Sequence, residues 1–210
     1  FISDEKKLEK IEFADGKVWG VEEMMNSMTL FGSSENDTIN GTDKDEIIRG
    51  GEGDDTISGG AGNDDIYGES GNDILKGGLE NDIIDGGEGK DSIYGENGND
   101  RLFGRAGDDL IYGGEGKDYI KGNEGADVID GGFGADTIYG GEGSDTINSG
   151  GDSDTVYGGE GNDVINGYLG SDKLYGDGGA DTIYGGEESD TIYGGDGADT
   201  ISGNEGTDIV

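Results

Sequence analysis

The 210-residue sequence contains no cysteine, no histidine and no proline. Without Cys and His, the chain has no disulfide framework, no zinc finger and no nucleophilic site of the Cys-His or Ser-His-Asp type. Cations are scarce as well, because 13 Lys and Arg stand against 50 Asp and Glu, a net charge of −37. Such a polyanion repels phosphates, so we expect no nucleic-acid partner. No apolar run approaches the roughly 18 residues that a membrane span needs.

Hydrophobic residues make up only 29% of the chain. A composition this polar and this charged ordinarily predicts disorder, because too little apolar area can be buried to offset the conformational entropy lost on folding. Folding therefore requires a partner that brings many positive charges.

The chain has an internal period of nine residues, which runs from Gly32 to the last residue through twenty units without insertion or deletion. Position 1 of the unit is Gly in all units except one, which has Ser149. Position 6 is Asp in all units except one, which has Glu46, and position 8 is Ile, Leu or Val in every unit. These three positions carry different physical meanings.

The aliphatic position 8, flanked by residues that are often β-branched or aromatic, predicts a strand of about three residues at positions 7 to 9. The other six residues must turn, and glycine at position 1, often at position 2 and usually at position 4 supplies the positive φ values that turns need. A three-residue strand is not stable alone, so we expect a solenoid in which successive units stack and bury a file of aliphatic side chains.

The acid at position 6 needs a chemical reason. Units stacked at a strand spacing of about 4.8 Å place these carboxylates in a file of like charges, which is strongly unfavourable unless cations lie between them. Carboxylates and exposed turn carbonyls are the ligands that Ca²⁺ prefers, whereas Mg²⁺ demands stricter octahedral geometry and softer metals prefer His or Cys.

The pattern Gly-Gly-x-Gly-x-Asp-x-aliphatic-x resembles the RTX (repeats-in-toxin), haemolysin-type calcium-binding repeat over residues 32 to 210. The resemblance implies an all-β fold, a right-handed parallel β-roll in which consecutive nonapeptides form opposite sides of an 18-residue coil. It also implies a calcium ion between turn n and turn n+2, held by position-6 carboxylates and turn carbonyls. Twenty units allow at most 18 such pairs, so full occupancy brings at most 36 positive charges against −37.

Carried over to this sequence, the resemblance assigns metal ligands at two kinds of position. The carboxylates are Asp37, Asp55, Asp64, Asp73, Asp82, Asp91, Asp100, Asp109, Asp118, Asp127, Asp136, Asp145, Asp154, Asp163, Asp172, Asp181, Asp190 and Asp199, with Asp208 at the end of the series. The turn carbonyls, chosen at positions 2 and 4, are Gly51, Gly53, Gly60, Gly62, Gly87, Gly89, Gly114, Gly116, Gly132, Gly134, Gly141, Gly143, Gly159, Gly161, Gly195 and Gly197.

Position 4 departs from Gly in five units, and four of the five are even-numbered. The residues are Glu35, Lys44, Glu80, Asp152 and Glu188. Because consecutive units alternate sides, one calcium ladder keeps its glycines and the other is interrupted. We expect the even ladder to hold the weaker ions, above all near Lys44, since a side chain in a turn of positive φ costs about 1 kcal/mol.

Residues 1–31 lie outside the repeat. Ile11 and Phe13 before Asp15-Gly16, with Trp19 after it, predict a short β-hairpin. Apolar residues from Val21 to Met28 follow helical spacing, so we expect a hairpin and helix that cap the first coil. The other interpretation is a docking site for an upstream domain. Because Phe1 is not an initiator Met, we also expect the chain to be part of a longer protein with further domains on both sides.

The resemblance to the RTX repeat implies a non-catalytic, calcium-binding module of a secreted or surface bacterial protein, which folds on external calcium after type I secretion. One alternative is an adhesive or carbohydrate-binding module with a cell-surface partner, using a ladder of Tyr139, Tyr157, Tyr175 and Tyr193 on one face. We prefer cross-strand stacking for this ladder. A further alternative is an accessory domain of a secreted enzyme. Fifty carboxylates make paired acids uninformative about catalysis.

Overall fold

The computed structural model describes residues 10–12, 18–20 and 29–210. Strand β1 (Lys10–Glu12) pairs antiparallel with β2 (Val18–Gly20), which confirms the predicted hairpin. Its turn at Asp15-Gly16 and the helix predicted over residues 21–28 fall outside the described residues, and the described residues contain no helix. The structure therefore gives no support to the helical part of the cap, and docking of the hairpin on the first coil stays a prediction.

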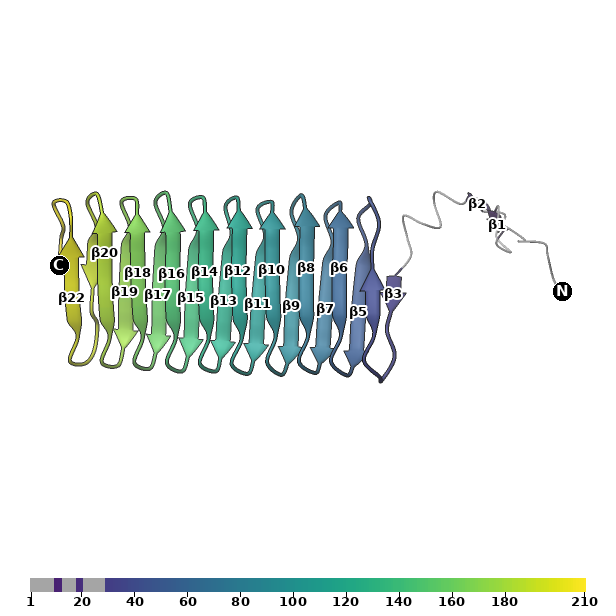
Figure 1. Cartoon of the computed structure of the whole chain (residues 1–210), viewed down its shortest axis with the longest axis horizontal. Coiled ribbons are helices and arrows are strands. Elements are labelled where there is room, and N and C mark those ends of the chain that lie inside the picture. The colour runs from purple at the N-terminus through teal and green to yellow at the C-terminus, as the bar shows by residue number, and fades with distance from the viewer. Residues whose placement is uncertain (1–9, 13–17, 21–28) are drawn as a thin grey trace.

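Residues 29–210 form two parallel ten-stranded sheets, and the chain alternates between them (Figure 1). One sheet contains β4 (Thr38–Asn40), β6 (Thr56–Ala61), β8 (Ile74–Leu79), β10 (Ser92–Asn97), β12 (Leu110–Glu115), β14 (Val128–Phe133), β16 (Thr146–Gly151), β18 (Val164–Leu169), β20 (Thr182–Glu187) and β22 (Thr200–Asn204). The other contains β3 (Thr29–Phe31), β5 (Ile47–Glu52), β7 (Asp65–Ser70), β9 (Ile83–Glu88), β11 (Arg101–Ala106), β13 (Tyr119–Glu124), β15 (Thr137–Glu142), β17 (Thr155–Glu160), β19 (Lys173–Gly178) and β21 (Thr191–Tyr193).

Neighbouring strands within each sheet are separated by two nonapeptides in the sequence. Ile39 lies opposite Ile57 in one sheet, and Ile48 lies opposite Ile66 in the other. This register confirms the predicted coil of two consecutive nonapeptides on opposite sides, stacked into a parallel β-solenoid. The right-handedness of the coil stays a prediction.

The predicted strand length is wrong. Most strands have six residues rather than three, because each continues from positions 7 to 9 of one unit into positions 1 to 3 of the next. Glycine at position 1 leaves room for the acid of its own unit and for a carbonyl of the next coil, so the backbone can continue as a strand there. Position 2 pairs with the next coil whether or not it is glycine, as Arg105 opposite Asn123 shows. Only positions 4 to 6 remain outside the strands, and the acid of position 6 lies in this tight turn.

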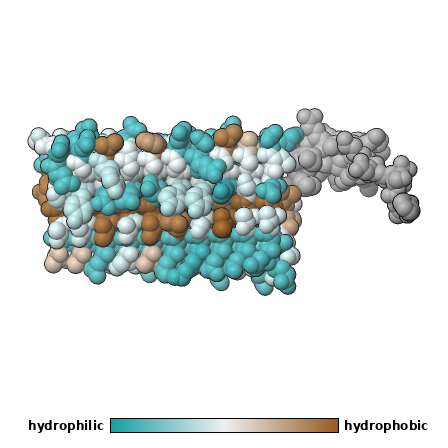
Figure 2. All heavy atoms as spheres, in the orientation of Figure 1, coloured by the Kyte–Doolittle hydropathy of each residue, from teal (hydrophilic) through white to brown (hydrophobic). Residues whose placement is uncertain are grey.

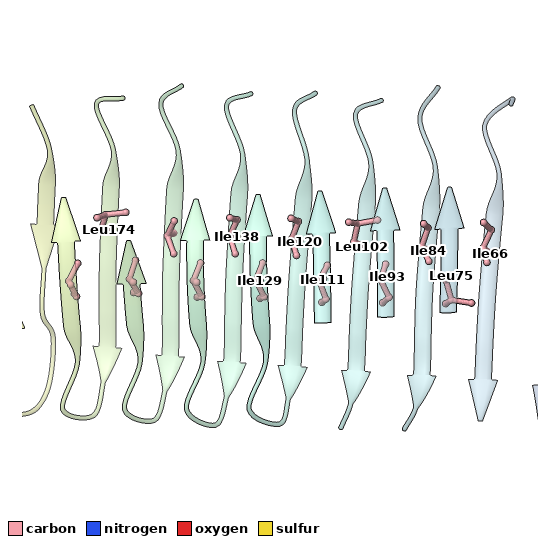
Figure 3. Close-up of a cluster of buried hydrophobic side chains, with 14 of the residues drawn as sticks. Ile66, Leu75, Ile84, Ile93, Leu102, Ile111, Ile120, Ile129, Ile138 and Leu174 are labelled. Atoms are coloured by element: carbon pink, nitrogen blue, oxygen red, sulfur yellow. The ribbon is translucent and has the colours of Figure 1, made fainter. Parts of the chain in front are cut away.

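The core is two files of position-8 side chains that meet between the sheets. Every such side chain from Ile48 to Ile192 has an exposed fraction of 1% or less. Figure 3 shows the two files, with Ile84, Leu102 and Ile120 coming from one sheet and Ile93 and Ile111 from the other. One large apolar side chain per nine residues is a thin core, so the stack depends on what happens in its turns.

Hydrophobic residues on the outer surface lie in a band along the length of the roll, between hydrophilic borders (Figure 2). On the sheet that begins with β3, the rings of Tyr139, Tyr157, Tyr175 and Tyr193 stack with centroid separations of 4.8, 4.8 and 5.2 Å and interplanar angles of 7°, 8° and 9°. This confirms the predicted ladder. The ring faces contact one another, so the ladder presents edges and hydroxyl groups to solvent.

Substituting Tyr157→Ala is expected to destabilise the calcium-loaded roll by about 1 to 3 kcal/mol, because the ring loses two stacked neighbours at about 0.5 to 1.5 kcal/mol each. Denaturant unfolding in saturating calcium measures the change. The matched control is Tyr184→Ala, since Tyr184 lies in register between Asn166 and Ser202. Equal effects of the two substitutions would show that stacking contributes nothing beyond burial.

Candidate metal centre

The position-6 carboxylates lie inside the turns and are almost completely buried. From Asp55 to Asp190 their exposed fractions are 1 to 2%. The tight turn of positions 4 to 6 turns this side chain inward, and the next coil covers it. A file of acids is therefore held out of water, which is costly for any charged group that lacks a partner.

One carboxylate oxygen of each acid is satisfied by the neighbouring coil. The backbone N–H of Asp55 donates to Oδ1 of Asp73 at 2.7 Å, and that of Asp73 donates to Oδ1 of Asp91 at 2.8 Å. The same bond repeats along both sides of the roll, up to Asp181 donating to Asp199 and Asp190 donating to Asp208, each at 3.0 Å. Position 6 thus links successive coils even before a metal is considered.

The other carboxylate oxygen has no protein partner. Within residues 29–210, the buried Oδ2 atoms that accept no hydrogen bond belong to Asp55, Asp64, Asp73, Asp82, Asp91, Asp100, Asp109, Asp118, Asp127, Asp136, Asp145, Asp154, Asp163, Asp172, Asp181 and Asp190. Native proteins rarely leave a buried polar atom unpaired, and sixteen in one repeated position indicate a missing partner. A cation at each turn would supply it.

Burial raises the pKa of the position-6 acids from Asp64 to Asp172 in the metal-free roll. Desolvation is the first cause at every position from Asp64 to Asp172, opposed by the backbone hydrogen bond from the preceding coil and reinforced at many positions by neighbouring carboxylates. The pKa rises from 3.8 to about 7 at Asp82 and Asp109 and to about 6 at Asp73 and Asp118. A metal-free roll therefore holds its acids in an environment that opposes ionisation.

The unpaired oxygen lies against position 1 of its own unit. A Cβ placed on Gly50 would collide with Asp55 Oδ2 and lie 2.7 Å from the carbonyl oxygen of Gly68, one coil further on. The same collision with Oδ2 recurs at Gly59 and Gly104. Glycine at position 1 therefore leaves room for the carboxylate oxygen beside a backbone carbonyl of the next coil. Both are oxygen donors of the kind that hard cations prefer.

One family model matches this chain along the whole stack of coils. The RTX calcium-binding nonapeptide repeat, in a model of four copies, matches residues 29–43, 40–75, 67–102, 76–111, 94–129, 112–147, 121–156, 139–174, 148–183 and 175–210. The chain belongs to this RTX repeat family. It is a calcium-binding repeat module, and the buried acids of its roll are consistent with calcium sites. No curated protein matches the chain.

The structure places the glycines predicted as RTX carbonyl ligands in two rows of close contact between coils. A Cβ on Gly51 would collide with the carbonyl oxygen of Ser33, and one on Gly71 with that of Gly53, so the carbonyls of positions 2 and 4 point at the same position of the next coil. The unpaired Oδ2 of each acid lies beside the glycine at position 1, and not beside those at positions 2 and 4. The assignment of positions 2 and 4 as calcium ligands stays a prediction.

Position 4 of the RTX unit adopts positive φ even where it is not glycine, as the sequence predicted, at Glu80 (69°), Asp152 (74°) and Glu188 (69°). Glu80 Oε2 accepts the N–H of Gly62 at 3.0 Å, and Glu188 Oε2 accepts that of Gly170 at 2.9 Å. These acids thus stabilise the turn one coil earlier. The prediction of backbone strain at Lys44 is wrong, because Lys44 is not among the residues of positive φ.

Position 5 has a role that sequence reasoning missed. The backbone N–H of Asp54 donates to Asn36 Oδ1 at 3.0 Å, and that of Asn72 donates to Asp54 Oδ1 at 2.9 Å. A similar row runs along the other side through Asn63, Asn81 and Asn99. The frequent Asn and Asp at position 5 were the available signal, since short amides and acids bond readily to turn backbone.

No helix in the described ranges is long and apolar enough to cross a membrane.

Proposed function

We propose that this module is a calcium-dependent folding unit of a secreted or surface bacterial protein. In this proposal the chain is unfolded where calcium is scarce, leaves the cell by type I secretion, and folds when it meets external calcium. The observation that carries the proposal is the file of sixteen buried carboxylate oxygens without a partner. The family assignment supports the destination, because RTX repeats are typical of extracellular bacterial proteins.

The size of the electrostatic penalty supports coupling between calcium binding and folding. A carboxyl whose pKa rises from 3.8 to about 6 costs about 3 kcal/mol to keep ionised at neutral pH. Repeated along the stack, this cost exceeds the total stability of an ordinary folded domain, which is about 5–15 kcal/mol. Cation binding must therefore supply the free energy of folding, as it does in small metal-dependent domains.

The proposed ligands are the position-6 carboxylates from Asp55 onward, with backbone carbonyls of the adjacent turns completing the oxygen shell. Calcium supplies charge and coordination here and no chemistry. The buried acids have structural tasks, since one oxygen of each already bonds the neighbouring coil. We accordingly propose a non-catalytic module, which fits an accessory domain of a secreted enzyme as well as any other extracellular protein.

The tyrosine ladder favours a structural role over carbohydrate binding. A sugar ring stacks on a free aromatic face, whereas both faces of Tyr157 and Tyr175 are covered by neighbouring tyrosines. The ladder therefore stabilises the sheet, as cross-strand aromatic pairs do.

Folding is expected to have its midpoint at a calcium concentration of about 0.1 to 1 mM, the range of extracellular calcium modules. A calcium titration followed by circular dichroism and by resistance to protease measures this midpoint. A midpoint in the range of intracellular sensors, about 0.1 to 10 μM, would contradict folding on external calcium, because such a chain would also fold before export.

A further inference from the structure

The first coil of the roll differs from all the coils that follow it in how its position-6 acids are satisfied. Asp37 Oδ2 accepts hydrogen bonds from Ser33 N at 2.6 Å and Ser33 Oγ at 2.8 Å. Glu46 is bonded in the same way, since its Oε2 accepts Thr42 N at 2.9 Å and its Oε1 accepts Thr42 Oγ1 at 2.6 Å. Asp199 and Asp208 at the far end of the roll are half-buried like Asp37, but within residues 29–210 no comparable hydroxyl bonds their Oδ2 atoms, so the bonds from position 2 distinguish the first coil.

Both donors stand at position 2, which is glycine in eleven of the twenty units and variable in the others. Where the next two units have Gly51 and Gly60, Ser33 and Thr42 each place a hydroxyl beside the acid four residues later. Position 4 breaks the repeat in the same two units, with Glu35 and Lys44, and neither of these has the positive φ that position 4 adopts at Glu80, Asp152 and Glu188. The hydroxyl residues at position 2 and the changed turn at position 4 thus coincide in one coil.

The longer side chain of Glu46 fits this arrangement. From Asp55 onward, one oxygen of the position-6 Asp accepts the N–H of the preceding coil, and the other stays unpaired up to Asp190. Glu reaches back far enough for both of its oxygens to be bonded by Thr42, one by the backbone N–H and one by the hydroxyl. Its burial, with 6% of the residue exposed, is therefore compensated by protein donors.

We propose that the first coil is closed by hydroxyl groups instead of calcium, so that the row of ions on each side of the roll begins one coil later, at Asp55 and Asp64. Ser33 and Thr42 perform at Asp37 and Glu46 the task that a cation performs at the other turns. The sixteen acids with an unpaired Oδ2 then correspond to sixteen ions, two fewer than the eighteen pairs of turns. The assignment of Asp37 as a calcium ligand, predicted from the repeat, is replaced by this one.

The inference rests on the proposal that position-6 acids bind calcium in the later coils. The experiment tests that proposal and the hydroxyl-closed first coil separately. Native mass spectrometry counts the calcium ions bound per chain for the wild type, Asp37→Asn, Asp55→Asn and the control Glu52→Gln, which removes one charge from an exposed position 3. We expect one ion fewer for Asp55→Asn and the wild-type count for Asp37→Asn and Glu52→Gln. Loss of an ion from Asp37→Asn as well would overturn the hydroxyl-closed coil and leave the position-6 assignment standing. No loss from either Asp variant would overturn both.

A gain-of-binding variant provides the second measurement. Ser33→Gly combined with Thr42→Gly removes both hydroxyl donors and restores the residue that position 2 has in the next two units. The carboxylates of Asp37 and Glu46 then lose their side-chain donors, and we expect up to two additional ions per chain. A count unchanged from the wild type would contradict the proposal, because it would mean that the hydroxyl groups do not stand in for calcium.

Discussion

Chelating calcium at pH 7.5 is expected to abolish the β-solenoid, and an equal concentration of Mg²⁺ is expected not to restore it. The reason is the file of buried acids, which at this pH are ionised and lie one coil apart along the stack. Each loses hydration without gaining a counter-charge, and the position-8 side chains provide too thin a core to compensate. Mg²⁺ demands a near-ideal octahedral shell and loses its waters reluctantly, so it fits the carbonyl-rich turns poorly.

Circular dichroism and small-angle scattering measure the loss of β structure and the expansion of the chain in chelator, before and after millimolar Ca²⁺ or Mg²⁺ is added. Sodium chloride at equal ionic strength is the control, since it screens exposed charges and leaves buried ones little affected. A spectrum rich in β structure in excess chelator at pH 7.5 would show that the unpaired oxygens are tolerated without a cation.

Acid is expected to replace calcium in part. In chelator, lowering the pH from 7.5 to about 4.5 is expected to shift the chain toward the compact β form. The buried acids from Asp64 to Asp172 have folded-state pKa values of about 6 to 7, above the 3.8 of the unfolded chain. The folded state therefore binds more protons between these values, so the free energy of unfolding rises as the pH falls through 7 toward 4.

The sign is opposite to that of a domain stabilised by salt bridges, which loses stability in acid because its carboxylates have lowered pKa values. Protonation removes the buried charge, and each neutral acid still accepts the N–H from the preceding coil. A pH titration of the dichroism in chelator measures the effect, and 1 M NaCl at pH 7.5 controls for the general screening of the −37 net charge. A calcium-free chain that becomes less structured between pH 7 and 5 would contradict the prediction.

The period of nine was enough to predict a stacked solenoid with a buried position-8 file, because both depend only on which residues recur. The alternation of sheets and the register of two nonapeptides were predicted from the resemblance to the RTX repeat, and the strand pairing confirms them. The strand length was underestimated. Glycine at position 1 was interpreted as a turn residue of positive φ, whereas it lies within a strand, has no positive φ, and leaves room for the acid of its own unit and a carbonyl of the next coil. Local propensity and stacking compete at this position, and stacking decides.

The candidate site was predicted at the level of residue type. Position 6 was identified because an acid repeated along a stack has few explanations other than a cation. Which of its two oxygens is hydrogen-bonded and which is unpaired depends on how adjacent coils are aligned, and the sequence does not specify this alignment. The same is true of the bonds from Ser33 to Asp37. The sequence contains the hydroxyl, yet nothing in a nine-residue pattern says that its oxygen reaches the acid four residues later.

The register of two nonapeptides between neighbouring strands sets a rule for how the length of this protein can change. Removing a single nonapeptide between Tyr139 and Tyr157 would leave every unit intact, but all later units would exchange sheets and the two halves of the tyrosine ladder would lie on opposite faces. Removing two nonapeptides would only shorten the roll. Losing or gaining one unit therefore moves all later units to the other face, whereas losing or gaining two units changes only the length. Insertions and deletions that preserve the surface must come in pairs of units.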